Sequence, residues 1–322
     1  MLSHKHSSLR QALFITDEER RDRDKQALVK DGDNMNIGFI GAGRAGCSLG
    51  KYLSEKQQDI SGFYDISQDM ARSASDFVGT KSYGRIEELV ADSDVIFITT
   101  PDGIITKVWE QLRKMPIQDK LVCHCSGALS SSSFSGIEGT GAKCLSIHPM
   151  LPFSNRFSSY QQLNNAFFTI EGDEEAVRQM KELFISFGNQ VCRIEGSCKV
   201  KYHAAASMLS NQVIAVLDTG FHLLEACGFS RDEARAASAA LIRNNIENVL
   251  SKDCVGALTG PIDRTDVETV KKHFACLDKE ERKMYEVLGE KLVQIARQKN
   301  PDVDYTEMKK EIENYEEYGC HI

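Results

Sequence analysis

The stretch Asn36-Ile37-Gly38-Phe39-Ile40-Gly41-Ala42-Gly43-Arg44-Ala45-Gly46 decides the fold of this chain. A short β-branched and aromatic run breaks into Gly-x-Gly-x-x-Gly and then opens a helix, as in a dinucleotide-binding βα turn. Gly41 permits the tight turn, Gly43 lets the backbone approach a pyrophosphate, and Gly46 lets the helix pack closely on the strand. The helix directs its N-terminal N–H groups at the phosphates. The residues predicted to bind the dinucleotide here are Gly41, Ala42, Gly43, Arg44, Ala45 and Gly46.

A second predicted strand, residues 60–64, ends at Asp65. Asp65 lies 19 residues after Gly46, close to the spacing of about 20 at which a carboxylate meets the adenosine ribose. A carboxylate there accepts a hydrogen bond from the 2′-hydroxyl of NAD and repels the 2′-phosphate of NADP. Arg44 and Arg72 lie nearby in sequence, and their positive charges could bind the 2′-phosphate of NADP. The sequence therefore favours NAD and leaves NADP open.

Composition and charge narrow the class of protein. The 322 residues carry a net charge of −8, with 41% hydrophobic and 27% charged residues, which is typical of a globular protein of about two domains. The acidic balance argues against a nucleic-acid partner. No apolar run approaches the roughly 20 residues of a membrane span, and residues 1–34 lack the pattern of a targeting segment. We therefore expect a cytoplasmic protein with an N-terminal extension of unknown role.

The ten cysteines are scattered, without any Cys-x-x-Cys. Cys123-His124-Cys125 lies on a predicted strand, where neighbouring side chains point to opposite faces and do not converge on zinc. Reduced thiols and no metal site are therefore expected.

Strand and helix patterns alternate as far as residue 194. The predicted strands after the first are residues 60–64, 80–83, 94–102, 120–125, 143–147, 167–170 and 190–194. This βαβ rhythm predicts an α/β domain with a doubly wound, mostly parallel sheet. Long helical patterns without strand signals follow, over residues 199–227, 230–251 and 267–298, and predict an all-α domain. The predicted divisions are an extension (1–34), a Rossmann domain (35–196), a helical substrate and dimerisation domain (197–312) and a tail (313–322).

Polar residues follow several of the predicted strands, at the sheet edge where ligands of open α/β folds bind. Thr99, Thr100 and Pro101 end one buried strand, and we expect them beside the nicotinamide half of the cofactor. Ser126 ends the next strand and can bind a carboxylate or carbonyl, although a plain turn explains it as well. His148 ends a further strand, where it either faces the substrate or caps loop carbonyls.

The first C-terminal helix carries Lys199, His203, Ser207 and Asn211, four residues apart. This spacing predicts one polar stripe, with His203 as a proton donor and Asn211 as a substrate ligand. The alternative is that these polar residues form the solvent-exposed face of an amphipathic helix. Arg264, in a turn after Gly-Pro, is a candidate clamp for a substrate carboxylate, or else pairs with a neighbouring aspartate.

Taken together, these motifs resemble the Rossmann-like proteins with a C-terminal DUF2520-type domain, relatives of the 6-phosphogluconate dehydrogenase-like superfamily. The residues that carry the resemblance are Gly41–Gly46, Thr99-Thr100-Pro101-Asp102, His124-Cys125-Ser126-Gly127-Ala128, Ile147-His148-Pro149, Tyr202-His203-Ala204-Ala205-Ala206, Ser210-Asn211 and Ala257-Leu258-Thr259-Gly260-Pro261-Ile262-Asp263-Arg264. One departure is Thr265, where the family usually has glycine. The superfamily also places a lysine four residues before an asparagine on the equivalent helix, and here Ser207 precedes Asn211 instead.

The resemblance implies an NAD(P)-dependent oxidoreductase that reduces a small 2-oxo acid, similar to alternative ketopantoate reductases, in the cleft between the domains. It implies that His203 or His148 transfers the proton, that Asn211 and Ser126 orient the substrate, and that Arg264 grips its carboxylate. It also implies a homodimer formed through the helical domain. One alternative is a prephenate-dehydrogenase-like NAD enzyme, because the run His148-Pro149-Met150 is similar to one in prephenate dehydrogenases. The other alternative is a catalytically inactive protein that binds a dinucleotide as a sensor or scaffold.

Overall fold

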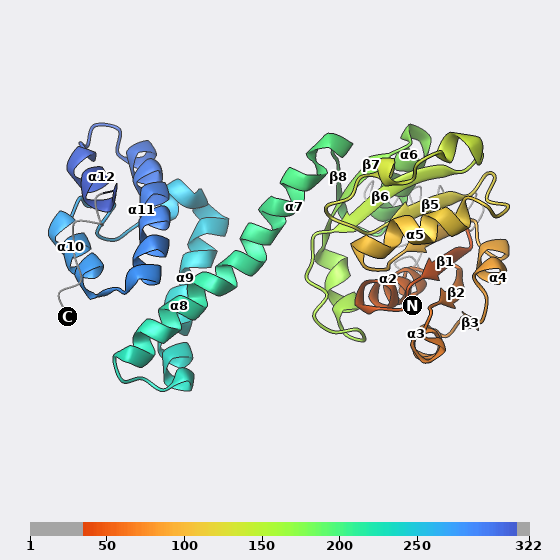
Figure 1. Cartoon of the computed structure of the whole chain (residues 1–322), viewed down its shortest axis with the longest axis horizontal. Helices are drawn as coiled ribbons and strands as arrows, with labels where there is room; N and C mark the ends of the chain where they lie inside the picture. Colours follow the sequence, from red (N-terminus) through yellow and green to blue (C-terminus); the bar gives the residue numbers. More distant parts are fainter. Residues whose placement is uncertain (1–34, 314–322) are drawn as a thin grey trace, which may run out of the picture. The chain divides into compact units, whose positions relative to one another are not determined.

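The computed structural model describes residues 35–313, so the predicted N-terminal extension and nearly all of the tail lie outside the described residues. The described chain divides into two compact units, the first ending at Ser210 and the second beginning at Asn211 (Figure 1). This division falls within the first long C-terminal helix, because the first turns of that helix still pack in the first unit. The predicted domain limit, between residues 196 and 197, lies shortly after the last strand instead, and it stays a prediction.

The first unit is built on one eight-stranded sheet with the order β3-β2-β1-β4-β5-β6-β7-β8 (Figure 1). Its strands are β1 Ile37–Ile40, β2 Ile60–Tyr64, β3 Lys81–Tyr83, β4 Val95–Ile98, β5 Leu121–His124, β6 Lys143–Pro149, β7 Phe167–Gly172 and β8 Gln190–Arg193. β1 to β6 pair in parallel. The predicted doubly wound, mostly parallel α/β sheet is therefore confirmed.

The last two strands run against the rest of the sheet. β7 pairs antiparallel with β6 and parallel with β8. An antiparallel neighbour needs no crossover helix, and the connection from β6 to β7 contains only the short 3-10 helix Ser159–Asn165. That segment packs on α2 (Arg44–Glu55), the helix that follows β1.

Both faces of the sheet are buried, as the continuous apolar strands require. On one face Phe39 and Phe97 stack with ring centroids 5.3 Å apart, beneath α2, α3 (Gln68–Val78) and α6 (Glu174–Ser186). On the other face Ile96 and Ile98 contact α4 (Ile86–Ala91) and α5 (Asp102–Leu112). Because successive strand residues point to opposite faces, one parallel sheet supplies two cores. Because β1, β2, β4 and β5 run parallel, the loops that follow these strands lie at one carboxyl edge of the sheet.

The second unit consists of helices. They are α8 Val213–Ala226, α9 Arg231–Ala257, α10 Val267–Cys276, α11 Lys279–Lys299 and α12 Thr306–Glu313. α9 begins at a capping box formed by Ser230 and Glu233. The core of the second unit joins Phe274 of α10, Val293 of α11 and Tyr305, which directly precedes α12, among other residues. No strand occurs in the described part of this unit, as the sequence predicted.

Two of the three predicted C-terminal helices are interrupted. The segment 267–298 is two helices, because Asp278 accepts hydrogen bonds from the backbone N–H groups of Glu280 and Glu281 and starts α11. The segment 199–227 begins as α7 (Lys199–Ser207), becomes a π-helix at Met208–Gln212 and continues as α8. A π turn has i→i+5 hydrogen bonds, so each of its residues rotates less about the helix axis than in an α-helix. Such turns are frequent at functional sites. Among the residues that the structure describes, no helix is long and apolar enough to cross a membrane.

Candidate active site

The glycine loop after β1 has the geometry that each glycine was predicted to provide. Gly41 has φ +106°, and a Cβ there would lie 2.9 Å from the backbone carbon of Thr99. A Cβ on Gly46 would lie 2.2 Å from the Gly41 carbonyl oxygen, so α2 can approach the loop only at a glycine. A Cβ on Gly43 meets nothing within 4 Å. The backbone at the N-terminus of α2 is therefore open to a ligand, with its N–H groups pointing outward.

Asp65 reaches back to the same loop. Its Oδ2 accepts a hydrogen bond from Ala42 N at 2.8 Å, and its Oδ1 accepts one from Ser67 N at 2.9 Å. A carboxylate offers about four acceptor positions, so both oxygens can also accept from a ribose hydroxyl. Arg44 is exposed at the start of α2, whereas Arg72 already pairs with Asp69 at 2.5 Å.

The residues that follow β4 lie next to the glycine loop. Thr99 Oγ1 donates to the Gly41 carbonyl at 2.7 Å, so this hydroxyl supports the glycine loop. Thr100 Oγ1 is buried without a hydrogen-bond partner in the described part of the chain, and a buried hydroxyl normally has one. Pro101 is the N-cap of α5. The open Gly43 backbone, the Asp65 acceptor and the Thr100 hydroxyl together fit a nicotinamide dinucleotide, which supplies hydride chemistry when bound.

Ser126, directly after β5, is the hub of a second polar cluster. Its hydroxyl donates to Asp102 Oδ2 at 2.8 Å and accepts from the backbone N–H groups of Ala128 and Leu129 at 3.1 and 2.9 Å. Its own N–H donates to His124 Nδ1 at 3.2 Å. The Ser126 hydroxyl is thus committed to shaping the loop, and its place in the site is that of a positioning group.

Lys199, at the first turn of α7, lies beneath this loop and is only 1% exposed. Its Nζ donates to the Ser126 carbonyl at 2.7 Å and to Ser146 Oγ at 2.8 Å. Burial lowers the pKa of Lys199 to about 8, while the carboxylates of Glu171 and Asp102 oppose that shift. The ammonium therefore stays charged at neutral pH and ties α7 to the ends of β5 and β6.

Two imidazoles meet over Gly127. A Cβ on Gly127 would lie 2.5 Å from His203 Cδ2 and 3.0 Å from His148 Nε2, so only glycine leaves room for both rings. The ring centroids of His148 and His203 are 6.3 Å apart. His148 is half-buried, and its Nδ1 lies 2.7 Å from the hydroxyl oxygen of Tyr202. His203 is exposed.

Burial governs the protonation of the histidines around Lys199. Burial, with a smaller contribution from the nearby Lys199 ammonium, lowers the pKa of His148 to about 4. Burial also lowers the pKa of His124 to about 4, against the effect of its hydrogen bond to the Ser130 carbonyl. Both rings are neutral at pH 7, so each carries a single N–H.

The polar stripe on the first C-terminal helix stays a prediction, and its residues differ in burial. Lys199 is buried, His203 is exposed and Ser207 is half-buried, and the π-helix then changes the rotation before Asn211. Asn211 is exposed in that π turn, at the first residue of the second unit.

Arg264 is exposed in the second unit. Of the two neighbouring aspartates, Asp263 binds Lys299 Nζ at 2.8 Å and Asn300 Nδ2 at 3.0 Å instead. The pKa of Asp266 is lowered by hydrogen bonds from Thr269 and, to a smaller extent, by the charge of Arg264. Thr265 has φ +56°, which explains why glycine suits this position in the family that the sequence resembles. Asp266 is the N-cap of α10 and accepts from Thr269 N.

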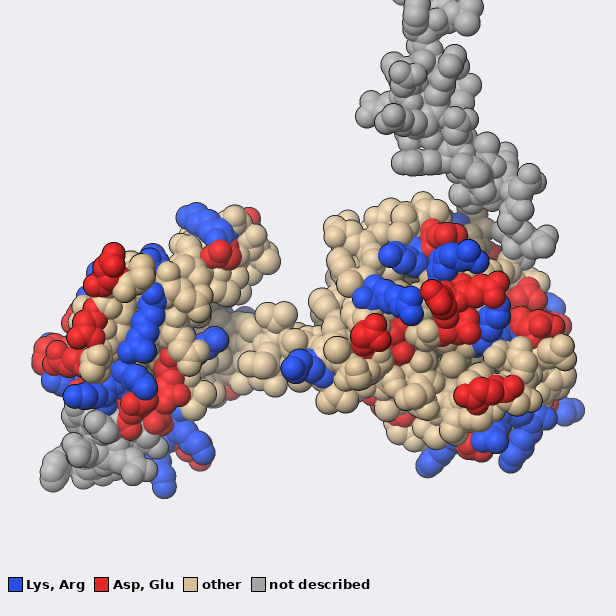
Figure 2. All heavy atoms as spheres, turned by 90° about the horizontal axis from the view of Figure 1, so that it is seen from above, with Lys and Arg blue, Asp and Glu red and all other residues tan. Residues whose placement is uncertain are grey.

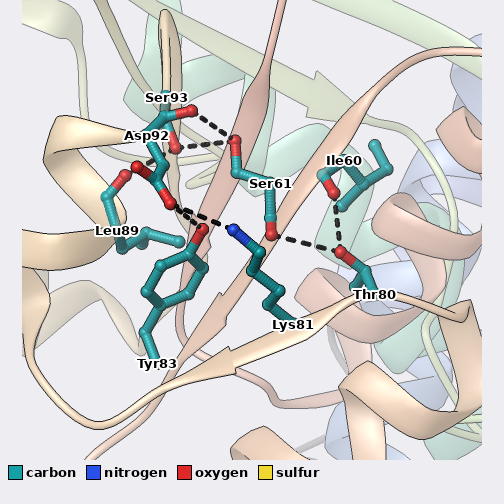
Figure 3. Close-up of polar contacts among 8 residues, drawn as sticks. All are labelled: Ile60, Ser61, Thr80, Lys81, Tyr83, Leu89, Asp92 and Ser93. Atoms are coloured by element: carbon teal, nitrogen blue, oxygen red, sulfur yellow. Dashed lines mark hydrogen bonds and ion pairs between the residues drawn. The ribbon is translucent and has the colours of Figure 1, made fainter.

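The opposite, amino edge of the sheet also has an open hollow of about 760 Å³. Its polar groups bind one another: Tyr83 Oη donates to Asp92 Oδ2 at 2.7 Å, and Lys81 Nζ lies 3.4 Å from the same oxygen (Figure 3). Thr80 Oγ1 donates to the Ile60 carbonyl at 2.6 Å. These bonds tie the starts of β2 and β3 to the end of α4. Because the polar groups of the amino edge are satisfied by one another, we take the carboxyl edge as the candidate site.

Lys199 entered the sequence analysis only as a member of the polar stripe, and Tyr202 only as part of a motif that carries the resemblance, so neither was assigned a role in the site. Lys199 stands beside Lys201, and nothing local distinguishes a buried lysine from a solvated one. Tyr202 precedes His203, the residue that drew attention on this helix, and its partner His148 lies 54 residues earlier in the chain. A contact over that separation has no local sequence signal.

Two stretches of the chain match described protein families. Residues 22–149 match the Rossmann-like domain, and residues 166–292 match a domain of unknown function, DUF2520. Among curated proteins, glucose-6-phosphate 3-dehydrogenase of Bacillus subtilis is 29% identical over 125 residues. That match covers 38% of this chain and 35% of the relative, so the chain spans only about a third of the relative's length.

Solved structures share the fold over most of the chain. A protein of Thermotoga maritima has a TM-score of 0.65 and 23% identity, covering 81% of this chain and 98% of its own. A proposed NADP oxidoreductase of Bacteroides fragilis has a TM-score of 0.65 and 20% identity over the same shares. Pyrroline carboxylate reductase of Plasmodium falciparum, solved with NADP bound, has a TM-score of 0.55 and 14% identity, covering 89% of this chain and 99% of its own. At these identities the likeness shows the fold.

Proposed function

We propose that this chain, which joins a Rossmann-like domain to a DUF2520 domain, is an NAD(P)-dependent oxidoreductase that reduces the carbonyl group of a small 2-oxo acid such as ketopantoate. One observation carries the proposal: both imidazoles over Gly127 stand at the same sheet edge as the open glycine loop. This arrangement supports the proposal because imidazole N–H groups are suited to bind the oxygen of a carbonyl that accepts hydride.

Each residue of the first unit has a defined task in this proposal. The backbone at Gly43 and the carboxylate of Asp65 bind the dinucleotide. Lys199 and Ser126 hold the Gly127 loop in place through the hydrogen bonds described above. His148 or His203 then donates to the substrate oxygen as negative charge develops on it.

Asn211 and Arg264 belong to the second unit and remain proposed substrate ligands. The exposed guanidinium of Arg264 suits a substrate carboxylate because it can form two parallel hydrogen bonds. Arg264→Lys is expected to raise KM for the acid while leaving the dinucleotide Kd unchanged.

NAD is the proposed cofactor, because the Asp65 carboxylate, whose Oδ2 accepts from Ala42 N in the glycine loop and whose Oδ1 accepts from Ser67 N, lies where the adenosine ribose would bind. A 2′-phosphate there would meet a carboxylate, and Arg72 is already paired with Asp69. The exposed Arg44 is the remaining cation close to this position in sequence.

We also propose that the second unit forms a homodimer through α8 and α9. No residue of α8 is buried, and Ala234 is the only buried residue of α9. Ile214 and Leu241 are 64% and 67% exposed. The chain has no charged residue from Tyr202 to Leu217, and this stretch appears as a largely uncharged surface in Figure 2.

The exposed apolar side chains on these two helices need a cover, and a second copy supplies the same surface. Leu241→Glu is expected to give monomers by light scattering, whereas the control Val287→Glu, on the 60% exposed Val287 of α11, is expected to leave the dimer intact. A monomeric wild-type protein would refute this part.

The function is tested by titrating the protein with NADH and NADPH and following energy transfer from Trp109, the single tryptophan. Ketopantoate and a panel of 2-oxo acids are then added while the loss of nicotinamide absorbance is recorded. Oxidation with one acid supports the proposal. Binding without oxidation favours the sensor or the prephenate-type alternative, and failure to bind either nucleotide refutes the cofactor site.

A further inference from the structure

We infer that Tyr202 fixes His148 in the tautomer whose proton is on Nε2, and that this N–H selects a carbonyl rather than a protonated imine as the reacting group. The inference rests on the proposed function for the substrate, but the tautomer itself is a property of the free protein. It also distinguishes His148 from His203 as the group that contacts the reacting oxygen, which the sequence leaves open.

The first step is the direction of the hydrogen bond between Tyr202 and His148. The phenol oxygen lies 2.7 Å from Nδ1, with the two rings nearly perpendicular at 84°. Burial raises the pKa of Tyr202, so its hydroxyl keeps its proton at neutral pH. The hydroxyl of Thr169 also interacts with this phenol and lowers the tyrosine pKa, while it donates its own proton to the His148 carbonyl at 3.5 Å. Because a neutral imidazole nitrogen is a stronger base than a phenol oxygen, the phenol proton is directed at Nδ1.

The second step is the position of the remaining proton on His148. A neutral imidazole has one donor and one acceptor nitrogen. Because Nδ1 accepts from Tyr202, Nε2 carries the proton. Lys199, His203 and His124 all face this ring and disfavour a second proton, while burial has the largest effect in the same direction. The Lys199 ammonium also lies 5.7 Å from the ring centre of Tyr202.

The third step is what Nε2 faces. It lies against Gly127, where a Cβ would be 3.0 Å away, and no hydrogen bond of Nε2 occurs within residues 35–313. An N–H at this point is complementary to a carbonyl oxygen, which has lone pairs. A protonated imine presents its own N–H and no lone pair, so the two donors would oppose each other. The same hydrogen bond strengthens when carbonyl reduction places negative charge on the oxygen.

The chain contains a matched control for this pair. In the second unit Tyr285 Oη lies 2.7 Å from His273 Nδ1, with ring centroids 5.7 Å apart at 84°. The corresponding values for Tyr202 and His148 are 2.7 Å, 5.5 Å and 84°. Tyr285→Phe therefore removes an equivalent tyrosine–histidine bond within the second unit.

The tautomer is tested by long-range proton–nitrogen correlation NMR on the full chain with nitrogen-labelled histidine, assigning His148 by its loss in His148→Gln. At pH 7 we expect neutral His148 with the proton on Nε2. Tyr202→Phe should give a mixture of both tautomers at His148, whereas Tyr285→Phe should change His273 alone. A proton on Nδ1, or a charged imidazolium at pH 7, would overturn the tautomer assignment whatever the enzyme reduces.

The substrate class is tested with the nicotinamide cofactor that binds, comparing the 2-oxo acid panel with the cyclic imine 1-pyrroline-5-carboxylate. We expect kcat/KM for the best oxo acid to exceed that for the imine by about 100-fold or more. Tyr202→Phe should lower kcat for the acid roughly tenfold with KM nearly unchanged, and Tyr285→Phe should leave both unchanged. Faster reduction of the imine would overturn the carbonyl assignment, and reduction of neither compound would refute the proposed function while the NMR result still decides the tautomer.

Discussion

Two glycines of the same loop should separate the stability of the fold from cofactor binding. Gly43→Ala places a methyl group where no atom lies within 4 Å, whereas Gly46→Ala places one 2.2 Å from the Gly41 carbonyl oxygen and 2.4 Å from Thr99 Oγ1. The first methyl group occupies space that a pyrophosphate needs. The second collides with backbone that cannot move without displacing β1 from α2.

The magnitudes follow from these contacts. Gly43 is an N-cap with φ −72°, which alanine adopts without strain, so the cost is about 0.5–1 kcal/mol. For a unit of this size that lowers Tm by only ~1–4 °C. The overlap at Gly46 is expected to cost about 3 kcal/mol and ~6–12 °C. Conversely, Gly43→Ala should weaken dinucleotide binding by roughly 30-fold, equivalent to about 2 kcal/mol.

Thermal unfolding gives the first quantity, and energy transfer from Trp109, which is fully buried in α5, gives the dinucleotide Kd. Gly139→Ala is a suitable control, because a Cβ there also meets nothing within 4 Å and the residue lies in a 3-10 turn outside the loop. A Kd for Gly43→Ala within threefold of wild type, or an unchanged Tm for Gly46→Ala, would refute the reasoning.

Three further outcomes are expected. Asp65→Ala should raise the Kd for NADH about tenfold and shift preference toward NADPH, since the ribose acceptor and the repulsion of a 2′-phosphate disappear together; equal losses for both nucleotides would contradict the assigned contact. Gly127→Ala should lower kcat by roughly 100-fold, because its Cβ would displace His203 and His148, with nucleotide Kd measured as the internal control. The folded pKa of Lys199 is lowered to about 8 from 10.5, so the unfolded chain binds more protons between these values. Stability of wild type relative to Lys199→Met, measured by denaturant unfolding, should therefore rise from pH 8 to 10.5, by at most about 3 kcal/mol, and a flat difference would count against a buried, charged lysine.

Sequence patterns predicted the first unit well because its signals are local. Strand periodicity, the glycine spacing and the acid after β2 each depend on residues close together in the chain, and the structure reproduces them from Ile37 to Arg193. Helix ends were harder to predict: the break at Asp278 and the π turn at Met208–Gln212 lie inside apolar patterns that look continuous. The reversed direction of β7 depends on how a long loop crosses α2, which alternation alone does not reveal.

The sequence by itself determined the Rossmann-like fold, the glycine loop, the position of Asp65 at the end of β2 and the candidate histidines, because short-range spacing specifies backbone conformation and the end of each strand. Only the tertiary structure showed that Lys199 is buried under Ser126, that Tyr202 binds His148, and that Gly127 makes room for two imidazoles. These contacts join segments of α7 to the ends of β5 and β6, more than 50 residues apart. Burial and hydrogen-bond partners at such separations result from packing, and packing sets the protonation on which the proposed chemistry depends.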